Sequence, residues 1–369
     1  MFGGRSGEHE VSLMSARSIL SAVNREAYEV IEIGITHEGV WLVGEKVLDS
    51  MLQGSSGQLA QATILPDPSQ RALFQIEIGR DKGSIEYLSE LDVVFPVLHG
   101  TFGEDGTLQG FLELADLAYV GAGVLGSSLG MDKGVFKDVM RAHRIPVVES
   151  IVLSRQEIER DREGCILRAL QVSQLPLFVK PANLGSSVGI MKCKSRADLL
   201  EGLADAARYD RRVIVERGIE AREIEVSVLG NENPIASIPG EILPSREFYS
   251  YEAKYIDDAS RLLIPAPVPQ EISERVQELA VNAFKAIDCA GMARVDFLLE
   301  KKGEDGSQPG QLYLNELNTI PGFTKISMYP KLWEASGISY PALIDRLIEL
   351  ALERKADRDR TERRYRTDD

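Results

Sequence analysis

Apolar residues along the chain follow two spacings, one helical and one extended. Apolar positions three or four residues apart predict helices over 10–23, 107–117, 132–144, 195–210, 269–288 and 340–355. Runs rich in β-branched and aromatic residues predict strands within 28–36, 91–100, 146–154, 175–195, 211–234, 291–300 and 311–318. The first third of the chain alternates the two patterns in βαβ order, which predicts a parallel sheet, while 50–70 is expected to form a surface excursion.

The last two predicted strands form a hairpin whose loop, rich in Gly, Pro and Asp, is centred near Gly306. In an antiparallel pair the numbers of facing residues add to a constant, which for this loop is twice 306, or 612. Asp296 is then expected to face Glu316, and Arg294 to face Asn318. Because side chains alternate along a strand, all four should project from one face of the hairpin.

The paired acids of this hairpin predict a metal site. Facing Cβ atoms lie roughly 4.5–5.5 Å apart, and two carboxylates this close repel by about 3 kcal/mol at an effective dielectric of about 20. A cation between them would remove that cost. The oxygens of Asp296, Glu316 and Asn318 suit Mg²⁺, a hard ion that is usually shared with phosphates. The alternative is a solvated acidic hairpin without an ion, and the hairpin alone does not decide between the two.

Composition limits the class of protein. The chain has 369 residues, enough for two or three domains, and a net charge of −15 that argues against a nucleic-acid partner but not against ATP. No apolar run reaches the roughly 18–20 residues of a membrane span, and the first residues lack the features of a signal peptide. Three scattered cysteines give no disulfide framework. We therefore expect a cytoplasmic protein without a membrane or nucleic-acid partner.

A glycine-rich loop at 181–190 could bind phosphates. It contains Ser186 and Ser187 and follows Lys180, so its free backbone N–H groups could close over phosphate oxygens. It is not a P-loop, because a strand rather than a helix is expected after it. A plain hairpin turn is the other interpretation of this segment.

A second glycine cluster, Gly121 to Gly126, spells GxGxxG and could be the dinucleotide fingerprint of a nicotinamide-dependent oxidoreductase. Its late position, and a following helix expected only from Asp132, favour a linker that opens a new domain. The chain is accordingly divided into domains at 1–122, 123–216 and 217–355, with a charged and frayed tail at 356–369.

Four further polar residues have no pattern that places them in a site. His99 lies in the loop HGTFGEDG and is expected to be a structural histidine, and Glu104 of the same loop is expected on a solvated turn. Glu216 and Glu223 fall within predicted strands, where alternation alone assigns them no role.

Several longer motifs occur in a fixed order between Phe2 and Glu353. They are GGRSGEHEVS, HGTFGEDGTLQG, GMDK, VKPANLGSSVGI, YEAKY, ARVDF and NELNTIPGFTKISMYP. In length and order they resemble those of the D-alanine–D-alanine ligases of the ATP-grasp superfamily. The resemblance implies an α/β fold of three domains, in which an N-terminal parallel α/β sheet domain precedes central and C-terminal α+β domains that clasp ATP.

The resemblance also implies an activity. Two D-alanine molecules would be joined through an acyl phosphate, with release of ADP and phosphate, to supply a peptidoglycan precursor. ATP and two Mg²⁺ or Mn²⁺ ions would be required, and a homodimer is expected. D-Alanine–D-lactate ligation is the alternative within the family, and a non-catalytic homologue is a further one.

Single residues take roles from the same resemblance. Those expected at ATP are Lys133, Lys180, Ser187, Glu216 and Glu223, and those expected at the metal ions are Asp296, Glu316 and Asn318. Those expected to bind the amino-acid substrates are Glu10, His99, Ser327 and Met328. Those expected to act in catalysis are Glu10, Ser186, Lys254, Tyr255, Arg294 and the backbone of Gly322.

Three details refine these expectations. A loop around 246–260 is expected to close over the site, and its Tyr255 favours the dipeptide, because one group of D-lactate ligases typically has Phe there. The family often has Glu-Lys where this chain has Glu216-Arg217. Relatives usually have several residues before the first glycines, so the first strand is expected to be short here.

Overall fold

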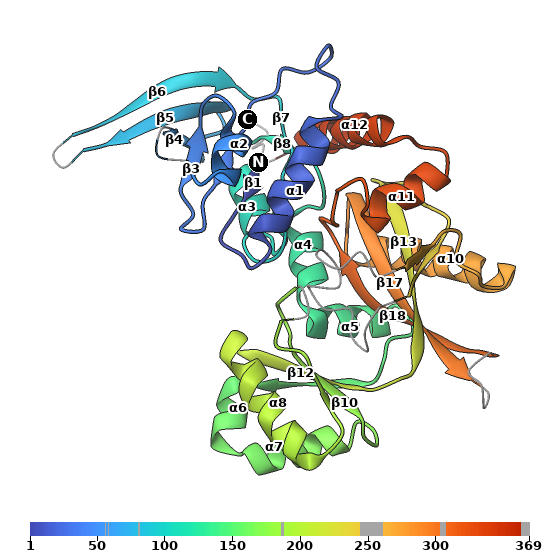
Figure 1. Cartoon of the computed structure of the whole chain (residues 1–369). Coiled ribbons are helices and arrows are strands. Elements are labelled where there is room, and N and C mark those ends of the chain that lie inside the picture. Colours follow the sequence, from blue (N-terminus) through green and yellow to red (C-terminus); the bar gives the residue numbers. More distant parts are fainter. Residues whose placement is uncertain are drawn as a thin grey trace, which may run out of the picture.

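The computed structural model describes residues 1–55, 57, 59–79, 82–185, 188–243, 261–302 and 308–362. It is a mixed α/β fold in three parts, and Figure 1 shows the N-terminal part above, the central part below and the C-terminal part to one side. Across those ranges, no helix combines the length and the apolar character needed to cross a bilayer.

The N-terminal part is built on a six-stranded sheet whose strands follow chain order. They are β1 (Phe2–Gly3), β2 (Gly34–Ile35), β3 (Trp41–Val43), β4 (Ala60–Ile64), β5 (Ala72–Ile78) and β6 (Gly83–Glu90). The β1–β2 pair is parallel, and the pairings from β2 to β6 are antiparallel. A separate parallel pair joins β7 (Val93–Val94) to β8 (Ala118–Tyr119). The expected parallel sheet is thus confirmed for two short pairs and wrong for the rest.

Residues 50–70 are more regular than a surface excursion. They include the end of α2 (Val47–Leu52) and the whole of β4. The next two strands, β5 and β6, form a hairpin that Figure 1 shows as an arm extending away from the rest of the chain. Leu73 is buried at the base of the arm, whereas Ile78 is exposed towards its tip. Polar alternation of this kind is a weak strand signal, which is why the sequence did not predict the arm.

Two helices of the N-terminal part match their predicted segments. α1 (His9–Leu20) buries an apolar stripe that includes Leu13 and Ile19. Glu8 is the residue directly before this helix. α3 (Thr107–Leu114) buries Leu108 and Leu112 in the same way. Both helices therefore pack an apolar stripe against the core of this part, although α3 also buries Gln109 and exposes Leu114.

The GxGxxG segment is a packed linker rather than an open loop. α4 (Val124–Met131) begins within it, so the expectation that the next helix starts only at Asp132 was wrong. A Cβ on Gly126 would lie 3.0 Å from the carbonyl oxygen of Asp288, and one on Gly291 would lie 3.1 Å from Cα of Gly121. The glycines therefore permit close backbone contact with the C-terminal part. That requirement accounts for Gly121 and Gly126 without a dinucleotide.

The central part is an antiparallel sheet in the order β11-β10-β12-β9, preceded by α5 (Lys133–Ala142). Its elements are β9 (Ser150–Ser154), α6 (Arg155–Arg160), α7 (Arg162–Leu170), β10 (Leu177–Pro181), β11 (Met191–Cys193), α8 (Arg196–Tyr209) and β12 (Arg212–Arg217). Asp132 caps α5 by accepting from two first-turn N–H groups, as its sequence position predicted. Helices α6, α7 and α8 lie together in this part (Figure 1).

The C-terminal part is a sheet in the order β16-β15-β13-β17-β18, with β14 paired to β13. Its elements are β13 (Ala221–Gly230), β14 (Ile235–Ala236), β15 (Gly240–Leu243), β16 (Arg261–Leu263), α10 (Gln270–Ala286), β17 (Gly291–Lys302), β18 (Gln308–Asn318), α11 (Met328–Ala335) and α12 (Tyr340–Asp359). Apolar residues of β13, β17 and β18 pack with α10 in the largest core cluster, among them Val226, Val295 and Phe284.

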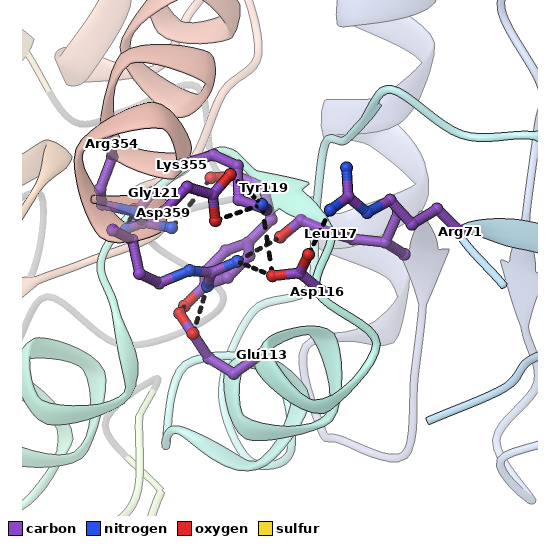
Figure 2. Close-up of polar contacts among 10 residues, drawn as sticks. Arg71, Glu113, Asp116, Leu117, Tyr119, Gly121, Arg354, Lys355 and Asp359 are labelled. Carbon is purple, nitrogen blue, oxygen red and sulfur yellow. Dashed lines mark hydrogen bonds and ion pairs between the residues drawn. The ribbon is translucent and has the colours of Figure 1, made fainter. Parts of the chain in front are cut away.

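The end of α12 docks on the N-terminal part (Figure 2). The Arg354 guanidinium lies 4.2 Å from the centre of the Tyr119 ring and donates to the carbonyls of Tyr119 and Gly121. Lys355 forms an ion pair with Asp116 at 3.2 Å. Because the helix continues to Asp359, the expectation of a frayed tail from residue 356 was wrong for its first four residues, 356–359.

Candidate active site

A cavity of about 830 Å³ is lined by all three parts of the chain. The N-terminal part contributes Glu8, His99 and Glu104, and the central part contributes Lys133, Phe178, Lys180 and Glu216. The C-terminal part contributes Glu223, Glu225, Arg294, Asp296, Glu316, Asn318 and Gly322. We call this cavity the cleft. Site residues that the sequence predicted in distant segments of the chain therefore lie together in the cleft.

The hairpin that supplies the acidic residues has the predicted register. Asp296 pairs with Glu316 and Arg294 pairs with Asn318, as the sum of 612 requires. A register shift follows directly after Asp296, so the same sum does not hold further along the two strands. The prediction from the loop centre is confirmed where the polar residues lie.

Strand alternation explains why these polar side chains face the cleft. On β17, Val295 and Phe297 are buried in the core with α10, and Arg294 and Asp296 alternate with them on the opposite face. β13 follows the same rule, because Ile224 and Val226 pack in the core whereas Glu223 and Glu225 line the cleft. One face of the sheet is thus apolar and packs in the core, and the other is polar and lines the cleft.

Protein cations already compensate the acids of the cleft. Arg294 donates to both carboxylate oxygens of Asp296, at 2.8 and 2.7 Å, and lies 3.0 Å from Glu225. Lys133 Nζ lies 3.6 Å from Glu316. The repulsion expected between the facing carboxylates is therefore offset by side chains, and repulsion alone does not demand a metal ion.

The donor set nevertheless fits a hard divalent ion. Asp296, Glu316 and Asn318 lie on one face of one hairpin, and all three line the cleft. The Asn318 amide also donates to Asp296 at 3.0 Å, so its side chain is held at this position. Two carboxylates and an amide are oxygen ligands of the kind that Mg²⁺ and Mn²⁺ prefer.

Three residues of the central part form a buried charge cluster at the cleft wall. Glu216 pairs with Lys180 at 2.6 Å through one oxygen and with Lys137 at 3.0 Å through the other. Burial disfavours the charge on Glu216, but the two lysines outweigh burial and lower its pKa to about 2. Both oxygens of its carboxylate therefore form ion pairs with lysines. The sequence had not singled out Lys137 as one of these partners.

His99 and Glu104 hold the segment at Ile320 from the N-terminal part. His99 Nδ1 lies 2.8 Å from the Ile320 carbonyl, and Nε2 lies 3.1 Å from Ser15 Oγ. Glu104 accepts from the N–H groups of Ile320, at 3.0 Å, and Gly100, at 2.7 Å. The expected solvated turn at Glu104 was thus wrong, and both ring nitrogens of His99 are engaged with protein rather than directed at a substrate.

Burial changes the pKa of both residues. It lowers the pKa of the His99 imidazole, which favours the neutral ring. Burial raises the pKa of Glu104 to about 8, and the neighbouring Glu8 carboxylate acts in the same direction. The charge of Glu8, which also faces the cleft, therefore adds to the effect of burial on Glu104.

Glu10 is not in the cleft, which corrects its expected role. It lies on the exposed side of α1, where one carboxylate oxygen is 3.7 Å from His37. Glu8, two residues earlier in the same motif, lines the cleft. Two residues along a helix turn a side chain by about 200°, so Glu8 and Glu10 cannot face the same way. The motif contains both acids, and its letters alone did not show which one points inwards.

The remaining expected residues fall into two groups. Ser327 and Met328 lie at the start of α11, where the Ser327 hydroxyl bonds to Thr324, and neither lines the described part of the cleft, whereas Gly322 does. The residues that lie outside the described ranges are Ser186, Ser187, Lys254 and Tyr255, together with the expected closing loop at 246–260.

Known proteins are similar to this chain along nearly its whole length. A family model described as D-ala D-ala ligase N-terminus matches residues 1–122, and one described as D-ala D-ala ligase C-terminus matches residues 139–349. A D-alanine--D-alanine ligase of Natranaerobius thermophilus is 50% identical over 361 residues, which cover 98% of this chain and 96% of that protein.

Solved structures give the same result. The D-alanine-D-alanine ligase from Coxiella burnetii is 38% identical, with a TM-score of 0.79 over 97% of this chain and 94% of that one. The VanG D-Ala:D-Ser ligase from Enterococcus faecalis is 35% identical, with a TM-score of 0.81 over 95% of this chain and 97% of that one.

Proposed function

The chain belongs to the D-alanine–D-alanine ligase family, and we propose that it joins two D-alanine molecules at the expense of ATP. The products are D-alanyl-D-alanine, ADP and phosphate, and the dipeptide serves peptidoglycan synthesis. The observation that carries the proposal is the cleft, in which basic residues of the central part face the polar hairpin of the C-terminal part. This arrangement suits phosphoryl transfer, where catalysis consists mostly of positioning and charge stabilisation.

Lys133 and Lys180 are proposed to contact the ATP phosphates from the central part. Each is held in place by an acid, Lys133 near Glu316 and Lys180 against Glu216, so their ammonium groups are already positioned. Asp296, Glu316 and Asn318 would hold two Mg²⁺ or Mn²⁺ ions. Such ions, when bound, neutralise the charge that develops on the transferred phosphoryl group.

The first step activates a carboxylate, which is otherwise a poor electrophile. A carboxylate oxygen of the first D-alanine attacks the terminal phosphorus of ATP, the bond to ADP breaks, and an acyl phosphate forms. Glu8, in place of Glu10, is proposed to accept hydrogen bonds from the ammonium group of this D-alanine, because Glu8 is the acid of that motif that lines the cleft.

The second step forms the peptide bond. The neutral amine of the second D-alanine attacks the acyl carbon, and the carbonyl oxygen becomes negatively charged. Arg294 and the N–H of Gly322 both line the cleft and are proposed to stabilise that oxyanion. The carbonyl re-forms as phosphate leaves, and the attacking nitrogen loses one proton to the departing phosphate. At the start of α11, Ser327 and the backbone N–H of Met328 are proposed to bind the carboxylate of the second D-alanine.

The acceptor is a separate part of the proposal. One solved relative is named a D-Ala:D-Ser ligase, so the shared fold does not fix which acceptor is used. We propose D-alanine, on the strength of the curated relatives at about 50% identity and of Tyr255. We further propose that the chain acts in the cytoplasm and forms a homodimer, as expected for the family.

An assay of phosphate release tests the proposal. With ATP and Mg²⁺, we expect release that depends on D-alanine and yields one dipeptide for each phosphate. L-Alanine should not replace D-alanine, and D-lactate or D-serine should be poor acceptors beside it. ATP hydrolysis without any dipeptide product, or stabilisation by NADH but not by ATP with Mg²⁺, would count against the proposal.

A further inference from the structure

A ring of hydrogen bonds encloses the four residues 320–323 that contain Gly322. The N–H of Phe323 donates to Ser15 Oγ at 3.3 Å, and Ser15 Oγ lies 3.1 Å from Nε2 of His99. The other ring nitrogen of His99, Nδ1, lies 2.8 Å from the carbonyl of Ile320. The two ends of this short segment are therefore connected through two side chains of the N-terminal part.

The direction of each bond in the ring follows from elementary donor and acceptor rules. A carbonyl oxygen can only accept, so Nδ1 of His99 carries the hydrogen that bonds to Ile320. In the neutral ring Nε2 is then an acceptor, and it accepts the hydroxyl hydrogen of Ser15. The Ser15 oxygen remains an acceptor for the N–H of Phe323. All three bonds run in one consistent sense, and no atom has to serve as donor twice.

Glu104 fixes the same segment from its other side. One carboxylate oxygen accepts from the N–H of Ile320 and the other accepts from the N–H of Gly100 in its own loop. The peptide groups of Ile320 are thus held on both sides, the N–H by Glu104 and the carbonyl by His99. These contacts join the N-terminal and C-terminal parts across more than 200 positions of sequence.

Burial makes these contacts strong and specific. Ser15 is fully buried, and His99, Ile320 and Phe323 are each at most 4% exposed. A buried polar group that loses its partner is left without compensation for its lost hydration, so the segment has little freedom to move while all the partners are in place. The N–H of Gly322, two residues after Ile320, therefore has a fixed direction in the cleft.

We propose that Ser15, His99 and Glu104 are positioning residues that fix the N–H of Gly322 for oxyanion stabilisation. The inference rests on the proposed function, in which Gly322 donates to the developing oxyanion. None of the three residues needs to touch the reacting atoms. They act through the backbone of 320–323, and a displacement of about 1 Å in such a donor can cost about 100-fold in rate.

Ser15→Ala, with Ser12→Ala as its matched control, tests the proposal. Both serines are fully buried on α1, but the hydrogen bonds of Ser12 go to Gly3 and Val97, both within the N-terminal part. We expect Ser15→Ala to lower kcat by about 10-fold or more and to leave the KM for ATP unchanged. Ser12→Ala should keep kcat within about twofold, although both variants lose a buried hydroxyl.

A second variant separates positioning from general stability. In His99→Asn the amide nitrogen can replace Nδ1 at Ile320 but cannot reach Ser15, so the substitution breaks the same link as Ser15→Ala. If the ring acts as one unit, the double variant should lose no more kcat than the worse single variant, whereas independent effects would multiply.

The outcomes distinguish this inference from the proposed function. An unmodified chain that makes no D-alanyl-D-alanine would overturn the proposed function itself. An active chain in which Ser15→Ala and Ser12→Ala have equal kcat, or in which the double variant shows multiplied losses, would overturn the positioning role alone. If Ser15→Ala is insoluble, Glu104→Gln tests the other side of the segment, where the same loss of kcat at unchanged KM for ATP is expected.

Discussion

Lys137 and Glu216 form an ion pair at 3.0 Å in which the lysine side chain is fully buried. Burying a lysine is costly, and here burial lowers its pKa while the carboxylate opposes that change. Glu216 shares its second oxygen with Lys180, which lines the cleft. A charge cluster inside the central part thus fixes one of the two lysines proposed to contact ATP.

The cluster predicts an order of effects on stability. Lys137→Met leaves Glu216 paired with Lys180, so we expect a loss of about 1–3 kcal/mol in the free energy of unfolding. Glu216→Gln leaves two buried ammonium groups facing each other, so the loss should be larger, about 3–5 kcal/mol. The double variant should be more stable than Glu216→Gln alone. Urea unfolding measures all three, and equal losses for the two single variants would contradict the cluster.

The lowered pKa of Glu216 predicts that the difference in stability between the unmodified chain and Glu216→Gln depends on pH. In the unfolded chain a glutamate titrates near pH 4.3, whereas in the folded chain Glu216 has a pKa of about 2. A depressed carboxylate pKa contributes stability that is present above the unfolded pKa and is lost as the pH falls towards the folded one. The stability gap between the unmodified chain and Glu216→Gln should therefore shrink between about pH 5 and pH 3. A stability gap that stays constant over this range would mean that the pKa of Glu216 is not lowered in the folded chain.

The donor set of the hairpin predicts how many metal ions bind. In the presence of ATP, we expect two Mn²⁺ ions per chain by electron paramagnetic resonance. Asp296→Asn should lose at least one of them and lower kcat by about 100-fold or more, because the metal ions contribute several kcal/mol of charge stabilisation. Glu278→Gln, on the exposed side of α10 and on the far side of the sheet, should change neither value. Undiminished Mn²⁺ binding in Asp296→Asn would show that the acid is not a ligand.

The docking of α12 predicts a difference between two arginines of one helix. Arg354 contacts the Tyr119 ring and two backbone carbonyls of the N-terminal part (Figure 2), so Arg354→Ala should cost about 2–3 kcal/mol. Arg346 forms ion pairs with Glu349 and Glu353 on the exposed face, so Arg346→Ala should cost at most about 0.5 kcal/mol. Thermal unfolding of the two variants measures this, and equal midpoints would show that the docking contributes little.

The sequence predicted well where local rules decide the structure. The facing of Asp296 and Glu316 needed only a loop centre and the period of a strand, and it was confirmed. The cap at Asp132 and the start of α8 at Ser195 likewise depend on neighbours in sequence. These features are fixed by residues at most about 20 positions apart.

Predictions from the sequence were wrong where the partners of a residue are distant in the chain. Arg358 looked like part of a solvated tail, because Glu113 and Asp116, which form ion pairs with it, lie more than 240 positions away. Glu104 looked like a turn residue for the same reason, since its partner Ile320 is 216 positions away. Composition shows that a charge exists, but not what compensates it.

The transfer of oxygen from substrate to phosphate tests the central claim most directly. If D-alanine labelled with ¹⁸O in its carboxylate is supplied with unlabelled ATP and Mg²⁺, an acyl phosphate requires that one labelled oxygen leaves with the phosphate for each dipeptide formed. The account predicts that the released phosphate carries one ¹⁸O, as measured by mass spectrometry. Phosphate without the label, formed together with the dipeptide, would contradict it.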